Sequence, residues 1–260
     1  MTENFELRIL PDVQAIAQVA ADEFARLAQA AVHSRGVFTV ALPGGSTPRA
    51  LFSLLAERTA KKVPPELPWS QTQLFFSDER HVPPNHVNSN FRTANEFLLS
   101  RVPVPQWNVH RVRAEEPDAS FAASEYEREL AEVFKLEGDA QPRFDLIFVG
   151  MGADGHTASL FPGTRALHEM KRRVAANWVP KLNTFRITFT RPLIDNAAEV
   201  VLMVSGADKA EALAAAMDEG SSPEEYPVKY VQPKNGKVLW LVDQAAAEKL
   251  KPLPAGRSQA

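Results

Sequence analysis

Residues 145–163 read DLIFVGMGADGHTASLFPG, and this stretch decides which fold the sequence fits. An apolar run typical of a buried strand ends in a glycine-rich loop, which from Gly150 to Gly155 has the spacing G-x-G-x-x-G. Between a strand and a helix, that spacing is typical of a dinucleotide-binding loop. Alternatively, the glycines shape a tight loop that presents Asp154 and His156 to another ligand.

The residues after the third glycine argue against a dinucleotide. A dinucleotide-binding loop continues into a regular helix and is followed, about 20 residues later, by an acidic residue at a strand end. Here Pro162 follows Gly155 within two helical turns, and the nearest acid, Glu169, lies in ALHEMKRR, which does not resemble a strand end. We therefore expect a tight loop that projects Asp154 and His156.

Outward from this loop, continuous apolar segments alternate with amphipathic ones. This alternation predicts an α/β fold, in which a Rossmann-like, mostly parallel sheet is flanked by helices on both faces. The segments 172–179 and 185–190 alternate polar and apolar residues, which predicts a small added antiparallel β region. The proline-rich connectors 61–68 and 220–233 are too short for domain linkers, so we expect one α/β domain over residues 1–260. The expected strands cover residues 37–42, 72–79, 144–150, 199–206 and 237–243, and the expected helices cover residues 12–36, 49–57, 88–102, 118–134 and 207–217.

Composition excludes several classes of function. The 260 residues carry a formal charge of −3, without the basic excess typical of proteins that bind nucleic acid or anionic membranes. The sequence contains no cysteine, which excludes disulfides, thiolate catalysis and cysteine-ligated metals. Its first residues lack the pattern of a signal peptide, and no apolar run is long enough to span a bilayer. We expect a cytoplasmic protein that binds neither nucleic acid nor membrane.

In a doubly wound sheet, ligands bind beyond the carboxyl ends of the strands. The first such end is PGGSTP, where Gly44 and Gly45 allow a sharp bend, and Ser46 or Thr47 can cap a helix that begins near Pro48. Free backbone N–H groups and two hydroxyls at a helix N-terminus favour a phosphate. The loop is not a Walker loop, and the alternative is a capped turn without a ligand.

Cations gather near two further strand ends. In SDERHVPPNHVNSN, residues 77–90, Asp78 and Arg80 directly follow an apolar strand, and Arg80 could bind a phosphate or carboxylate with both guanidinium nitrogens. Lys181 and Arg186 flank a short loop before another strand and could complete an anion site. In both segments the alternative is a set of solvated surface charges.

His156 is the best candidate for acid–base chemistry. An imidazole titrates near neutral pH and can accept or donate a proton, and Asp154, two residues away, could orient it or contact a substrate hydroxyl. His81 and His86 lie in the second loop and are possible helpers. The spacing of the six histidines does not suggest a metal site.

Five segments, in order and over almost the whole chain, resemble the 6-phosphogluconolactonases: LPGGSTPRALF, FFSDERHVPPNHVNSN, DLIFVGMGADGHTASLFPGT, RITFTRPLIDNAAEVVLMVSG and NGKVLWLVDQAAAEKL. The resemblance implies the fold shared with glucosamine-6-phosphate deaminase and ribose-5-phosphate isomerase. It implies hydrolysis of 6-phosphoglucono-1,5-lactone to 6-phosphogluconate, the second step of the oxidative pentose phosphate pathway, without a metal or organic cofactor. It places catalysis at His156 and Asp154. The expected substrate-binding residues are Gly44, Gly45, Ser46, Thr47, Asp78, Arg80, Gly155, Lys181 and Arg186.

Two alternatives remain open. A glucosamine-6-phosphate deaminase shares the Gly-Gly-Ser-Thr-Pro turn and the glycine–histidine loop, but it would continue Ala-Phe-Asn-Glu-Pro where this chain has TASLFP. A non-catalytic sugar-phosphate sensor would reuse the fold with a DNA-binding segment, whereas the first 36 residues here predict one long helix. The expected ligand is a small sugar phosphate, and the expected assembly is a monomer or a small homo-oligomer.

Overall fold

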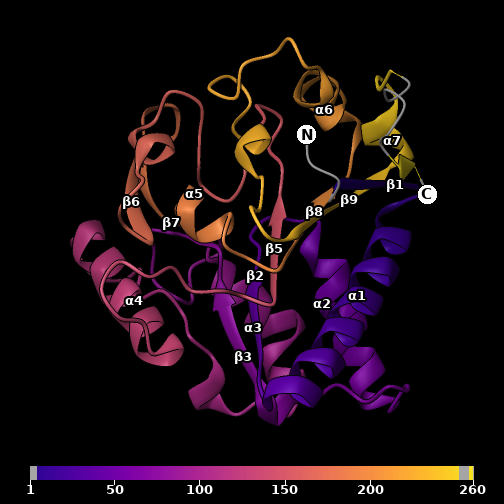
Figure 1. The fold of residues 1–260 in the computed structure, drawn as a ribbon, viewed down its shortest axis with the longest axis vertical. Coiled ribbons are helices and arrows are strands. Elements are labelled where there is room, and N and C mark those ends of the chain that lie inside the picture. Colours follow the sequence, from indigo (N-terminus) through magenta and orange to yellow (C-terminus); the bar gives the residue numbers. More distant parts are fainter. Residues whose placement is uncertain (1–4, 252–257, 260) are drawn as a thin grey trace.

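Apolar segments form a parallel central sheet in the computed structural model, which describes residues 5–251 and 258–259 (Figure 1). The strand order is β10-β1-β9-β8-β5-β2-β3, and all neighbouring strands pair in parallel. This arrangement confirms the predicted fold class. The strands are β1 (Phe5–Leu10), β2 (Phe38–Leu42), β3 (Thr72–Phe76), β5 (Leu146–Gly150), β8 (Glu199–Val204), β9 (Lys237–Asp243) and β10 (Ser258–Gln259).

Strand β1 was not predicted, because the expectation for the first 36 residues was a single helix. It pairs with β9 toward one edge of the sheet, where Leu7 is fully buried while Glu6 and Arg8 remain partly exposed. Parallel strands near an edge can keep one polar face. The alternation of polar and apolar residues in FELRIL therefore indicates a strand. The strand is not a continuous apolar run, because Glu6 and Arg8 are charged.

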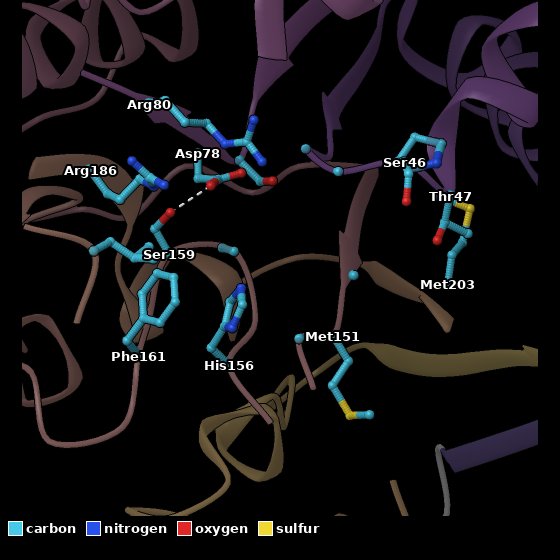
Figure 2. Close-up of a pocket in the computed structure, with 18 of the residues that line it drawn as sticks. Ser46, Thr47, Asp78, Arg80, Met151, His156, Ser159, Phe161, Arg186 and Met203 are labelled. Atoms are coloured by element: carbon cyan, nitrogen blue, oxygen red, sulfur yellow. Dashed lines mark hydrogen bonds between the residues drawn. The ribbon is translucent and has the colours of Figure 1, made fainter. Parts of the chain in front are cut away.

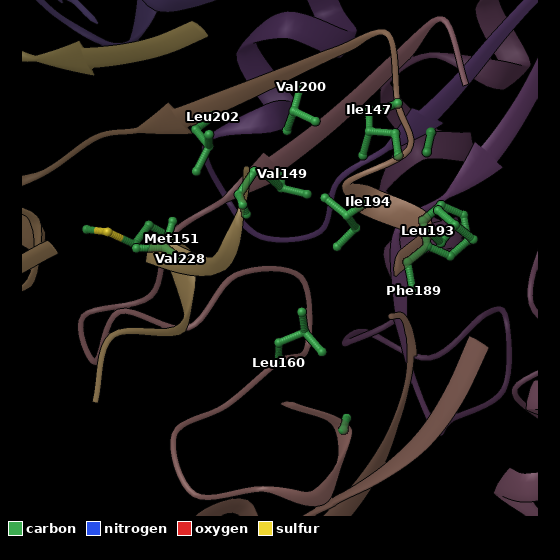
Figure 3. Packing of buried hydrophobic residues seen from close by; sticks show 14 of the residues in the cluster. Ile147, Val149, Met151, Leu160, Phe189, Leu193, Ile194, Val200, Leu202 and Val228 are labelled. Atoms are coloured by element: carbon green, nitrogen blue, oxygen red, sulfur yellow. The ribbon is translucent and has the colours of Figure 1, made fainter. Parts of the chain in front are cut away.

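Helices cover both faces of the sheet and bury alternate residues of each strand. In β2, Val40 and Leu42 pack against a first group of helices on one face of the sheet. Ala41, between them, belongs to the apolar cluster on the other face, and Figure 3 shows part of that cluster. The first group is α1 (Val13–Arg35), α2 (Pro48–Ala60) and α3 (Asn90–Phe97). The second is α4 (Ala119–Phe134), α5 (Arg191–Ile194), α6 (Ala210–Met217) and α7 (Gln244–Ala247).

Helix ends fall close to the positions that the sequence predicts. The side chain of Asp12 accepts from the N–H of Ala15 at 2.9 Å, and Gly36 ends α1 with a left-handed backbone, φ 76°. Ser89 caps α3 and Asp118 caps α4 through their side chains. Within the described ranges, no helix has the length and apolar character needed to cross a membrane.

A separate three-stranded antiparallel sheet has the order β4-β7-β6, which confirms the predicted antiparallel region. Its strands are β4 (Asp78–Arg80), β7 (Thr184–Phe189) and β6 (Val174–Val179). Strand β4 is a correction, because one strand was expected over residues 72–79, with the charged run at its end as either a solvated loop or a site; β3 instead ends at Phe76. The charged residues form a strand because β7 supplies backbone partners, and the pairing sets Arg80 directly opposite Arg186.

The topology of the central sheet places a crevice at the end of β2. From β2 the chain moves outward to β3, and it later returns to form β5 on the other side of β2. Ligands in doubly wound sheets bind at such a switch point, beyond the carboxyl ends of the strands. The loops that follow β2 and β5 therefore flank the expected binding crevice.

Candidate active site

A cleft of about 360 Å³ opens at this switch point, and loops from five parts of the chain line it. Figure 2 shows His156 next to Phe161 and below Asp78, Arg80 and Arg186, with Ser46, Thr47 and Met203 across the cleft from them. Most of the predicted site residues therefore come together. Those that line the cleft are Gly44, Gly45, Ser46, Thr47, Asp78, Arg80, His156, Lys181 and Arg186.

His156 and Asp154 form a hydrogen-bonded pair. The Asp154 Oδ1 atom lies 2.5 Å from Nδ1 of the imidazole. Because a carboxylate only accepts, Nδ1 carries the proton and Nε2 is left with a lone pair. The backbone N–H of Gly152 donates to the His156 carbonyl at 2.8 Å. A Cβ at Gly152 would lie 2.0 Å from Nδ1, so only glycine lets the imidazole fold back in this way.

The surroundings of His156 favour its neutral form. The ring stacks on Phe161 with 4.0 Å between ring centroids, and its side chain is 27% exposed. Burial lowers the pKa of His156 to about 4. The Asp78 carboxylate raises this pKa, while the cations of Lys209, Arg186 and Arg80 lower it further. At neutral pH the imidazole is therefore uncharged and able to accept a proton.

Asp78 is held rigidly at the wall of the cleft. Its Oδ2 atom accepts from the hydroxyl of Ser159 at 2.6 Å (Figure 2), and its Oδ1 atom accepts from the side-chain amide of Asn90 at 3.2 Å. The neighbouring Glu79 accepts from the backbone N–H groups of Asn90 and Phe91, which joins β4 to the start of α3. The charged segment after β3 is thus a fixed part of the site.

Arg80 and Arg186 place two guanidinium groups on adjacent strands. They are directly opposite partners in the β4–β7 pairing, and neither forms an ion pair with a carboxylate in the described part of the chain. Burial and the charge of Arg80 lower the pKa of Arg186. Like charges directly opposite each other destabilise a strand pair. An anion bound at the pair would remove that repulsion.

The loop after β2 presents polar groups at the start of α2. Gly45 has a left-handed backbone, φ 97°, and Gly44 packs so tightly that a Cβ would lie 2.3 Å from the Asn90 amide nitrogen. The predicted hydroxyl cap is wrong, because Thr47 has a helical backbone and its side chain makes no capping bond. Ser46 makes none either, so both hydroxyls face the cleft without a capping role.

Lys181 and Gly155 are already engaged by other groups of the protein. The Lys181 ammonium forms an ion pair with Asp154 and lies 4.8 Å from the centroid of the Phe161 ring, so it is engaged with the His156 pair. Gly155 does not line the cleft. Its N–H donates to the Gly152 carbonyl at 2.9 Å and its carbonyl accepts from Val228, so neither group is available to a substrate.

Several cleft residues were missed. Lys209 follows β8 and lines the cleft, and the strand-end rule applied to β8 would have found it. Phe161 and Ser159 lie in the same loop as His156, and both line the cleft. The two helper histidines do not line the cleft, since His81 contacts the Glu116 carbonyl and His86 accepts from the Asn88 N–H. In the ranges described, no cluster of three or more side chains could hold a metal ion.

Comparisons with known proteins find similar sequences and similar folds in one family. Residues 11–240 match the family model described as "Glucosamine-6-phosphate isomerases/6-phosphogluconolactonase". A 6-phosphogluconolactonase of Synechocystis is 41% identical over 85% of this chain and 88% of its own length. One of Nostoc is 36% identical over 94% and 98%. The solved structure of 6-phosphogluconolactonase from Trypanosoma cruzi is similar, with a TM-score of 0.81, 28% identity and coverage of 97% and 99%.

Proposed function

The chain belongs to the glucosamine-6-phosphate isomerase/6-phosphogluconolactonase family, and we propose that it hydrolyses 6-phosphoglucono-1,5-lactone to 6-phosphogluconate. The observation that carries this proposal is the neutral His156, oriented by Asp154, in a cleft lined by Arg80, Arg186 and Lys209. A base beside clustered cations suits an anionic substrate whose reaction begins with the deprotonation of water. Curated relatives that cover most of the chain bear the same activity in their names.

The reaction needs one base and one anion-stabilising group. Nε2 of His156 takes a proton from water as the water oxygen attacks the lactone carbonyl carbon, C1. The bond between C1 and the ring oxygen then breaks, and the imidazolium returns the proton to that oxygen. Asp154 keeps the proton on Nδ1 and stabilises the imidazolium. No covalent enzyme intermediate and no metal or organic cofactor is required, because a lactone carbon is already electrophilic.

The cations divide between phosphate and oxyanion. The 6-phosphate lies against Arg186, and the N–H groups and hydroxyls of Gly44 to Thr47, across the cleft at the start of α2, bind the opposite end of the sugar. Lys209 adds a further cation from the loop after β8. Arg80, opposite Arg186, supplies the second guanidinium and can also stabilise the oxyanion that develops on the carbonyl.

The residues after His156 favour the lactonase over the deaminase. In the deaminase pattern a glutamate follows the histidine closely, whereas this chain places Ser159 and Phe161 there. The Ser159 hydroxyl donates a hydrogen bond to Asp78, and the Phe161 ring stacks on the imidazole of His156. The loop therefore brings no carboxylate of the kind that the deaminase pattern supplies.

Turnover of freshly generated lactone tests the proposal. Glucose-6-phosphate dehydrogenase produces 6-phosphoglucono-1,5-lactone in situ, and after that reaction ends the loss of lactone is followed with and without this protein. We expect acceleration over spontaneous hydrolysis. No acceleration, together with ammonia release from glucosamine 6-phosphate, would replace the lactonase by the deaminase. Binding of sugar phosphate without either reaction would indicate a sensor.

The pH dependence of kcat/KM should report the ionisation of His156 in the free protein. Burial lowers the pKa of His156 from 6.5 to about 4, so the base is present above that value and is lost as the pH falls through it. We therefore expect kcat/KM to stay constant as the pH falls to 6.5 and to decline only below it. Stopped-flow measurement, with circular dichroism to confirm folding at each pH, checks this. Half-maximal kcat/KM at or above pH 6.5 would contradict a buried, neutral base in the free protein.

A further inference from the structure

The segment Ser222–Val231, which we call the brace, packs against the back of the catalytic loop. Gly155 has a left-handed backbone, φ 74°, and a Cβ there would lie 2.7 Å from Cδ1 and 3.0 Å from Cα of Tyr226. The backbone N–H of Val228 donates to the Gly155 carbonyl at 2.9 Å. Such a close approach explains why position 155 needs glycine, and it joins two segments that are far apart in the sequence.

Two backbone hydrogen bonds connect Gly155 to the residue that carries the imidazole, His156. Gly155 donates to the Gly152 carbonyl at 2.9 Å, and Gly152 donates to the His156 carbonyl at 2.8 Å. These bonds hold the backbone on both sides of Asp154, so a shift at Gly155 is passed on to the backbone of His156. Met151, where the loop begins, belongs to the same apolar cluster as Val228 (Figure 3). The side of the loop away from the cleft therefore rests on the brace.

The brace is fastened to the body of the protein independently of the cleft. None of its residues lines the cleft in the described part of the chain. Gln232, just beyond the brace, donates its N–H to Asp195 at 2.9 Å. The guanidinium of Arg191, on α5, lies 3.5 Å from the centroid of the Tyr230 ring. Both anchors lie at α5, so the brace can hold its position whether or not a substrate is bound.

We propose that Tyr226 is a positioning residue for the reaction, because its packing against Gly155 keeps the His156 imidazole at the depth and orientation needed to deprotonate water. The inference rests on the proposed function and deepens it. Tyr226 touches no reacting atom, and it acts on the rate only through the loop. A displacement of about 1 Å at a catalytic group can cost on the order of 10²-fold in rate.

A positioning role predicts a different pattern from a structural role. Removing the ring by Tyr226→Ala should lower kcat by about 10- to 100-fold while KM changes less than about 2-fold, since the phosphate-binding groups lie on other loops. Tyr226→Phe keeps the ring against Gly155 and should retain kcat. The matched control is Glu225→Ala, at the exposed neighbouring position. If Tyr226→Ala fails to fold, Tyr226→Leu, which removes less volume, is measured in its place.

Titration of His156 by NMR tests the inference without turnover. His156→Asn identifies its signal among the six histidines. If the brace holds the imidazole in its buried position, Tyr226→Ala should move the pKa of His156 upward toward 6.5, whereas Tyr226→Phe and Glu225→Ala should leave it unchanged. An unchanged titration in folded Tyr226→Ala, or an unchanged kcat where the wild type is active, would overturn the proposal. Absence of turnover by the wild type would instead refute the lactonase function and leave the NMR result to decide on the brace.

Discussion

Replacing His156 with asparagine should lower kcat by about 10²–10⁴-fold, which is the usual contribution of general acid–base catalysis, and should leave KM nearly unchanged. The asparagine fills a similar space beside Phe161 but cannot accept the proton of the attacking water. The groups expected to bind the phosphate lie on other loops and are not altered. Initial rates with freshly generated lactone, corrected for spontaneous hydrolysis, measure the effect.

The matched control is His33→Asn, because His33 is exposed near the end of α1. It should behave as the wild type. The double variant of His156 and Asp154 gives a second check, since two residues that act as one unit have non-additive effects. We expect the double variant to be scarcely slower than His156→Asn alone. A His156→Asn enzyme with normal kcat, or a double variant whose losses multiply, would contradict the assignment of the pair.

The sequence predicted most of the central sheet because its buried strands are continuous apolar runs. This pattern is typical of parallel strands that are covered on both faces. The same rule missed β1, whose charged residues alternate with Leu7. It also did not separate Asp78 to Arg80 from the strand expected over residues 72–79, because a strand that consists of charged residues is recognisable only from its partner. Strand β7 lies more than 100 residues further along the chain, and pairing at that separation leaves no local pattern.

For the site, the sequence predicted which loops converge but not which way their groups point. The strand-end rule brought together Gly44 to Thr47, Arg80 and His156, and the structure places all of them at one cleft. The rule cannot show that the N–H and carbonyl of Gly155 are used by the loop itself and by the brace. Nor can it show that the Lys181 ammonium is engaged with Asp154. Both outcomes depend on contacts between distant segments, and a spacing motif does not encode such contacts.

The Arg186→Met variant should bind substrate more weakly and yet be more stable when unliganded. Methionine keeps the length of the apolar stem but removes the charge-assisted hydrogen bonds to phosphate. Such bonds contribute about 1.5–3 kcal/mol each, or roughly 10- to 150-fold in kcat/KM, and we expect most of the loss in KM. In the free protein the substitution also removes the repulsion of Arg80, directly across the strand pair. Relief of a like-charge cross-strand pair is worth about 0.2–1 kcal/mol, so Tm should rise slightly.

Melting curves with and without 6-phosphogluconate separate the two effects. In the wild type the product should raise Tm, because a ligand that binds only the folded state stabilises it. In Arg186→Met the unliganded Tm should be higher and the rise on adding product should be much smaller. The control Arg128→Met removes an arginine that is paired with Glu125 on the exposed face of α4, and it should leave the product-induced rise intact. A lower unliganded Tm for Arg186→Met would show that packing of the stem, and not charge repulsion, dominates at this pair. An undiminished rise with product would place the phosphate elsewhere in the cleft, and the glycine loop with Lys209 would then be the anion site.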